Sequence, residues 1–136
     1  MNIKKLLIGG IVGAIVYFLL GWLIYEKLLV DFFNHHPGVV TGYNRTQPLF
    51  LYLVIGNLLA GFLLAYILAK ANVNSVGSGL TTGGIVGFLM ASSTDCIVFG
   101  TTLLVGRYAV AADVIAFTIM SAIVGAIIGT LPGSND

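Results

Sequence analysis

The stretch LLIGGIVGAIVYFLLGWLIYEKLLV, residues 6–30, decides the fold of this protein. Its only charged residues are Glu26 and Lys27, near its end. A helix needs about 20 apolar residues to cross the hydrocarbon core of a bilayer, so this run predicts a membrane-spanning helix. Three later runs have the same character. We therefore predict four spans, over residues 6–30, 48–69, 80–105 and 109–131.

The segments between these runs contain residues that favour loops and turns. Residues 31–47 include Pro37 and Gly38 and predict a loop, residues 72–79 predict a turn, and residues 106–108 predict a very tight connection. A membrane β-barrel would instead show alternating segments of about ten residues. The predicted fold class is all-α, a four-transmembrane-helix bundle that forms one integral-membrane domain over residues 1–136.

The composition leads to the same class. Charged residues make up 8% of the chain and hydrophobic residues 58%, and the mean hydropathy is +1.04. Soluble domains carry about 25% charged residues, so the lipid bilayer is the expected surrounding of this chain. The formal net charge of +1 excludes the broad basic surface of a nucleic-acid-binding protein. The first apolar run is too long for a signal peptide and predicts a retained signal-anchor helix.

The orientation in the membrane rests on the basic residues. Three lie on the side of the termini and three on the other side, so the positive-inside count is tied. Acidic residues accompany the second group and not the first, which favours cytoplasmic termini in a cell inner membrane. The two groups are Lys4, Lys5 and Lys70, and Lys27, Arg45 and Arg107.

A short motif occurs twice. The residues GGIVG stand at 9–13 and again at 83–87, each near the start of an odd-numbered span. One explanation is a duplicated two-helix hairpin, which would give a parallel repeat, and the other is chance in a chain rich in these residues. Small residues four apart let membrane helices pack closely. On this ground we predict packing contacts at Gly9, Gly13, Gly83, Gly87, Gly125 and Gly129.

Asp95 is the residue that most needs explanation, because it lies inside an apolar span. An acidic side chain at the bilayer centre costs about 2.5–3.5 kcal/mol on insertion scales, so it usually faces protein or water. With the third span ending at 105, Asp95 is expected about 15 Å deep. We predict hydrogen bonds from it to Ser92, Asn57 or Thr118, at a polar layer that also includes Thr102. The site is either a proton or cation relay, an anchor for a polar ligand, or a carboxyl that locks helices together.

Other candidate sites are weaker. His35 and His36 are adjacent on a loop with Asp31 nearby, and this spacing does not suit a metal ion, so we expect no metal site. No pattern for a cofactor or a catalytic set is present, and the protein is expected not to be an enzyme. A membrane enzyme using the loop histidines would need a pocket that joins the loop to the bundle. Cys96 is expected to be a buried, inert thiol.

Two segments carry a family resemblance. The residues GWLIY at 21–25, and Asp95 followed by GTT at 100–102, resemble small uncharacterised bacterial inner-membrane families that carry a domain-of-unknown-function label. The resemblance implies a four-helix membrane fold and no particular activity. We expect a non-enzymatic membrane protein that packs as an oligomer or as an accessory subunit of a larger membrane complex. The alternative is a small transporter or proton- or ion-handling protein built around Asp95.

Overall fold

The computed structural model describes residues 1–132. Four of its helices are long and apolar enough to cross a membrane. The prediction of an all-α bundle with four membrane-length helices is therefore confirmed. The elements are α1 (Ile3–Leu23), the π-helix η1 (Ile24–Leu28), α2 (Val30–His35), α3 (Phe50–Lys70), α4 (Val76–Thr101) and α5 (Arg107–Thr130).

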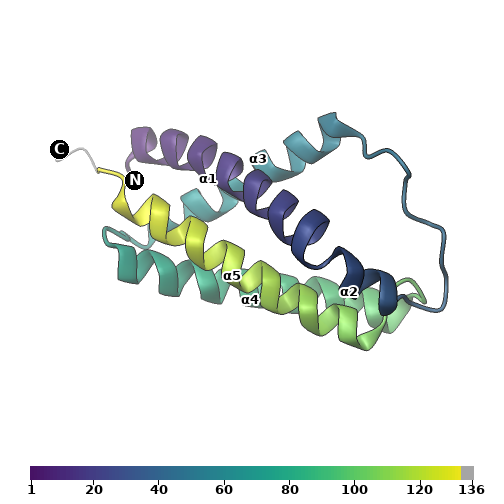
Figure 1. Ribbon diagram of the computed structural model, residues 1–136. Helices are drawn as coiled ribbons and strands as arrows, with labels where there is room; N and C mark the ends of the chain where they lie inside the picture. Colours follow the sequence, from purple (N-terminus) through teal and green to yellow (C-terminus); the bar gives the residue numbers. More distant parts are fainter. Residues whose placement is uncertain (133–136) are drawn as a thin grey trace.

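The bundle consists of two helical hairpins. The most extensive helix contacts are those of α4 with α5 and of α1 with α3, and contacts between α1 and α5 join the hairpins. Figure 1 shows α4 and α5 side by side, while α3 crosses α1. The near side of the bundle carries the N-terminus, the turn at 71–75 and the C-terminal end of α5. The far side carries the loop at 36–49 and the turn at 102–106 (Figure 1).

The boundaries of the third span differ from the prediction. Span 80–105 was expected, but α4 runs from Val76 to Thr101. It begins early because the Ser75 side chain accepts a hydrogen bond from the Ser78 backbone N–H and caps the helix. It ends early because the backbone of Thr102 is extended. The first span begins three residues and ends two residues before its predicted bounds. The second and fourth spans each differ from the prediction by two residues at the start and by one residue at the end.

The first loop is shorter than predicted because part of it is helical. In η1 the backbone N–H of Leu29 bonds to the carbonyl oxygen of Ile24 at 2.8 Å, five residues earlier, which is the π-helical pattern. Helix α2 then occupies Val30–His35. The expected loop over 31–47 is thus wrong for its first five residues, where local apolar and aromatic side chains sustain a helix.

The core lies in the near half of the bundle. Tyr17 from α1, Leu64 and Leu68 from α3, and Val124 and Ile128 from α5 are all buried in one cluster. Tyr17 is held there by a stacked contact with Phe117 at 5.7 Å between ring centroids, and by a 2.7 Å hydrogen bond between its hydroxyl and Ser121. The N-terminal half of α3, in contrast, is largely exposed. The helices are therefore packed tightly on the near side and more loosely on the far side.

The glycines of the repeated motif lie at helix interfaces. A Cβ at Gly13 would meet Gly61 of α3 and Ile128 of α5, and a Cβ at Gly83 would meet the Ser121 carbonyl oxygen of α5. In each hairpin the motif is thus on the first helix and faces the second. Duplication of a hairpin remains a hypothesis. The other contacts are those of Gly9 with Ile128 and Ala65, Gly87 with Ser121, Gly125 with Gly79, and Gly129 with Ser75.

Candidate functional site

Two carboxyl groups face each other on the far side of the second hairpin. Asp95 lies six residues before Thr101, where α4 ends, and Asp113 lies six residues after Arg107, where α5 begins. Because α4 and α5 are antiparallel neighbours, both carboxyl groups lie at one level, about 9 Å from the helix ends. Asp95 is thus shallower than the predicted 15 Å, since α4 ends four residues earlier than expected.

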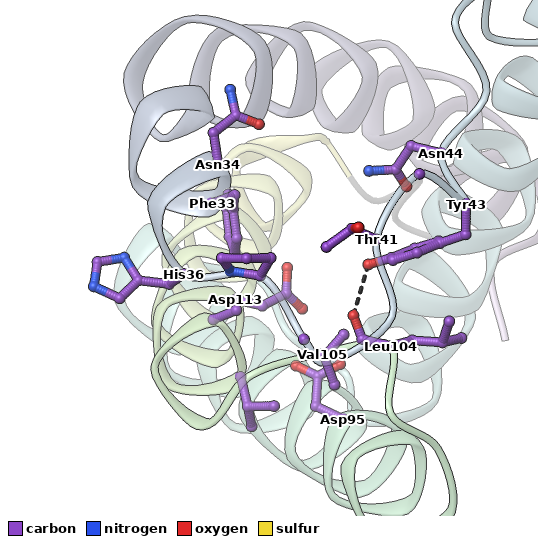
Figure 2. A pocket seen from close by; sticks show the side chains of 15 residues that line it. Phe33, Asn34, His36, Thr41, Tyr43, Asn44, Asp95, Leu104, Val105 and Asp113 are labelled. Atoms are coloured by element: carbon purple, nitrogen blue, oxygen red, sulfur yellow. Dashed lines mark hydrogen bonds between the residues drawn. The ribbon is translucent and has the colours of Figure 1, made fainter.

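A cavity of about 430 Å³ opens above this pair. Both carboxyl groups point into it, and the first loop forms its outer wall (Figure 2). The cavity therefore joins the far-side loop to an acidic pair inside the bundle. The lining residues from α2 and the first loop are Phe33, Asn34, His36, Pro37, Gly38, Thr41, Gly42, Tyr43 and Asn44. Those from the second hairpin are Asp95, Leu104, Val105, Ala109, Val110 and Asp113.

The pair consists of two hydrogen-bond acceptors without a donor between them. The Oδ2 atom of Asp95 is buried and has no hydrogen-bond partner within residues 1–132. The carboxyl group of Asp113 is its neighbour in the lining of the same cavity. Two ionised carboxylates cannot hydrogen-bond to each other, and neighbouring like charges repel. The arrangement therefore calls for a proton or another cation between them.

Tyr25 fixes one side of the pair. Its hydroxyl donates a 2.6 Å hydrogen bond to Oδ1 of Asp113. Tyr25 belongs to η1, and its ring also stacks on Phe33 of α2 at 5.8 Å between centroids. Such π-turns are frequent at functional sites.

The first loop is attached to the turn between α4 and α5. Pro37 and Val105 form an antiparallel bridge, and the Val40 backbone N–H donates to the Leu103 carbonyl oxygen at 3.0 Å. The Tyr43 hydroxyl donates to the Leu104 carbonyl oxygen at 2.8 Å (Figure 2). These contacts hold the loop over the acidic pair and shape the mouth of the cavity.

The other residues of the predicted polar layer do not bond to Asp95. Asn57 donates to the Leu53 carbonyl oxygen at 2.8 Å, and Thr118 donates to that of Val114 at 2.6 Å. Both bonds remain within their own helices. Thr118 also lies five residues beyond Asp113 along α5, about 7.5 Å deeper. The Thr102 hydroxyl donates to the Val98 carbonyl oxygen, four residues earlier in the chain. Ser92 lies one helical turn before Asp95, and the described part of the chain contains no hydrogen bond between the two.

Sequence reasoning missed Asp113 as the partner of Asp95. Asp113 was one of the acidic residues near the group of Lys27, Arg45 and Arg107, and it was used only for the orientation. The two acids are equally spaced from the turn at 102–106, but they are unequally spaced from the turn predicted at 106–108, which concealed the pairing. In the structure Arg107 lies over the ring of Tyr108, 4.9 Å from its centroid, and donates to its hydroxyl at 3.2 Å.

The two histidines contact backbone carbonyl oxygens of α2. Nδ1 of His35 lies 2.6 Å from the Asp31 carbonyl oxygen, and Nδ1 of His36 lies 2.8 Å from that of Phe32. His36 lines the cavity, but its ring points away from the acidic pair (Figure 2). Within residues 1–132 no group of three His, Cys, Asp or Glu residues could hold a metal ion. Cys96 is exposed, so the expectation of a buried thiol is wrong: it lies on the outer face of α4.

The four membrane-length helices and this cavity define a multi-pass α-helical membrane protein with an acidic pair reached from one side. No family model, no curated protein and no solved structure matches the chain. The resemblance to small bacterial inner-membrane families stays a prediction.

Proposed function

We propose that this protein is a small, non-enzymatic ion-handling membrane protein. In this proposal the carboxyl groups of Asp95 and Asp113 form one site that exchanges a proton for a small monovalent cation. The supporting observation is the buried, unpartnered Oδ2 of Asp95 beside a second carboxyl group at the floor of a cavity.

The chemistry of the exchange follows from the acceptor pair. With one proton bound, one carboxyl donates to the other and the repulsion between them is removed. When that proton leaves, the same two carboxylates face the cavity as oxygen ligands, which suit a hard cation. Tyr25 holds Asp113 in place in both states through its hydroxyl hydrogen bond. The bound cation therefore replaces the proton, and one proton is released for each cation taken up.

In this conformation the proton and the cation are proposed to reach the acidic pair from the far side alone. Toward the near side, the buried cluster that includes Tyr17, Leu64, Val124 and Ile128 fills the space between the helices. With the termini in the cytoplasm of a cell with an inner membrane, the cavity faces the opposite compartment. Transport across the membrane would require a second conformation in which this apolar cluster opens.

Proton release on addition of a cation tests the proposal. Purified protein in weakly buffered detergent solution is titrated with sodium or potassium chloride while a pH-sensitive dye reports proton release. We expect about one proton per chain from the wild type and none from Asp95→Asn. Asp31→Asn is the matched control, because Asp31 is an exposed carboxylate on the same side that does not line the cavity. Equal release from the wild type and Asp95→Asn would overturn the proposal.

A second candidate role is self-association through α4. Most of its outer face is uncovered, and that face carries the polar or small residues Ser93, Thr94, Cys96 and Gly100 where a lipid-facing helix would be apolar. Small and hydroxyl-bearing residues promote contact between membrane helices. Oxidative cross-linking in native membranes tests this role, since exposed Cys96 would form a disulfide-linked dimer that Cys96→Ser abolishes. Absence of a dimer band in the wild type would contradict it.

A further inference from the structure

Lys5 is a buried cation without an acidic partner in the described part of the chain. Only 6% of its surface is exposed, although it lies in the first turns of α1 on the near side. Its Nζ donates to the Val73 carbonyl oxygen at 2.8 Å and to Oδ1 of Asn74 at 3.1 Å. Both acceptors are neutral. An ammonium group has three donors, so these two bonds leave both a donor and the positive charge uncompensated.

A polar cavity of about 490 Å³ adjoins this lysine. It lies between the near ends of α1, α3 and α5. Its rim is formed largely by amide and hydroxyl side chains, and its floor is apolar. The lining residues are Asn2, Lys5, Leu68, Ala69, Asn72, Val73, Asn74, Gly129, Thr130, Leu131 and Pro132.

The charge distribution favours an anion in this cavity. The acidic residues of the described chain, Glu26, Asp31, Asp95 and Asp113, all lie toward the far side. The near side carries Lys4, Lys5 and Lys70. The negative ends of the α3 and α5 dipoles both border the cavity, but each amounts to about half a charge, and the positive end of the α1 dipole offsets one of them. A buried ammonium group in a membrane protein is expected to have a full counter-charge.

We propose that this cavity binds the phosphate group of an anionic lipid. Nζ of Lys5 donates its remaining hydrogen to a phosphate oxygen, and the amide side chains at the rim contact the same head group. A lipid suits the position better than free phosphate, because the cavity lies at the near ends of three membrane-length helices, the level at which lipid head groups are expected. The acyl chains would run along the outer faces of these helices while the phosphate enters the cavity. This inference is independent of the proposed exchange at Asp95.

Lipid binding to purified protein tests the inference. Native mass spectrometry in nonionic detergent counts the phosphatidylglycerol and phosphatidylcholine molecules that remain bound to the wild type, Lys5→Gln and Lys4→Gln. We expect selective retention of phosphatidylglycerol by the wild type, with about tenfold weaker affinity in Lys5→Gln. Lys4 is the matched control, since it is an exposed neighbour. Lys4→Gln should remain within about twofold of the wild type, because an exposed charge is screened.

Two further variants keep the test informative if Lys5→Gln fails to fold. Lys5→Arg retains the charge and donors and should retain the lipid. Asn72→Asp leaves the bonds of Lys5 intact and places a carboxylate in the cavity, so it should lose phosphatidylglycerol. Asn72 already has a backbone φ of 53°, which aspartate tolerates.

Three results would overturn the inference. The first is equal retention of phosphatidylglycerol by the wild type and by a folded Lys5→Gln or Asn72→Asp. The second is an equal loss in Lys4→Gln, which would show a diffuse surface charge. The third is displacement of the lipid by millimolar inorganic phosphate, followed over a phosphate titration, which would identify free phosphate as the ligand. Far-UV circular dichroism and a monodisperse elution profile establish that each variant is folded.

Discussion

Tyr17 and Ser121 form the polar contact within the buried core. Their hydroxyl oxygens are 2.7 Å apart, and Ser121 is fully buried on α5. No water reaches such a pair, so each hydroxyl depends on the other for its hydrogen bond. Hydrogen bonds between membrane helices contribute about 0.6 kcal/mol on average and about 1.7 kcal/mol at most.

A double-mutant cycle should measure this contact. Tyr17→Phe retains the ring that stacks on Phe117 and removes only the hydroxyl. We expect a loss of about 1 kcal/mol in unfolding free energy for Tyr17→Phe and for Ser121→Ala. The double variant should lose about 0.5–1.5 kcal/mol less than the sum of the two. Unfolding by denaturant in mixed micelles, followed by circular dichroism, gives these values. Additive losses would show that the two hydroxyls do not interact.

The site at Asp95 has the same dependence on a single neighbour. The carboxyl group of Asp113 and the hydroxyl of Tyr25 complete a chain of polar groups from α4 through α5 to η1. Each member comes from a different element. Loss of the Tyr25 hydroxyl would leave Oδ1 of Asp113 without its donor, and loss of either carboxyl group would remove half of the acidic pair, which is why these three residues act as one unit.

Among the elements, α4 and α5 form the closest helix pair. The backbones touch where small residues meet, and a Cβ at Gly125 would collide with the carbonyl oxygen of Gly79. Backbone atoms cannot move aside as a flexible side chain can. The close approach therefore depends on glycine at these positions and supplies the dispersion contacts that hold membrane helices together.

Gly125→Ala should destabilise the hairpin, with Gly100→Ala as its control. We expect Gly125→Ala to lower the unfolding free energy by about 1–3 kcal/mol, because the added methyl group separates the helices. A Cβ at Gly100 meets nothing within 4 Å. Alanine there should leave stability unchanged or raise it by up to about 1 kcal/mol through helix propensity. Similar effects of the two substitutions would contradict the proposed role of this interface.

At the scale of the whole molecule, the first loop belongs to the first hairpin and contacts the second hairpin on the far side. The loop begins after α2 and contacts the turn at 102–106 through backbone hydrogen bonds. Gly38 permits this contact, since a Cβ there would collide with backbone atoms of Leu103 and Leu104. The loop and the turn together enclose the cavity above the acidic pair.

Gly38→Ala should detach the loop from the turn. We expect amide hydrogen exchange at Val40, which donates to the Leu103 carbonyl oxygen, to become at least about tenfold faster. Exchange in α4 and α5 should be unchanged. Gly56→Ala is the control, because a Cβ at Gly56 on α3 meets nothing within 4 Å. Unchanged protection at Val40 in Gly38→Ala would show that the loop is held by other contacts.

The limits of sequence reasoning are clearest at α4. Its apolar length predicted a membrane span, and Asp95 within it predicted a polar site. The span was placed four residues late at both ends, because the cap by Ser75 and the extended backbone at Thr102 depend on local hydrogen bonds and not on hydropathy. That shift changed the depth of Asp95 and concealed its relation to Asp113.

The amino-acid sequence by itself determined the class of the protein and the number of its membrane-length helices. Continuous apolar runs need lipid or protein around them, and their length determines whether a helix can cross the hydrocarbon core of a bilayer. The tertiary structure alone decided that Asp95 lies beside Asp113 and that Lys5 borders a polar cavity. Such pairings depend on where each helix ends and how it is rotated against its neighbours, and those are set by turns, caps and close glycine contacts that act together.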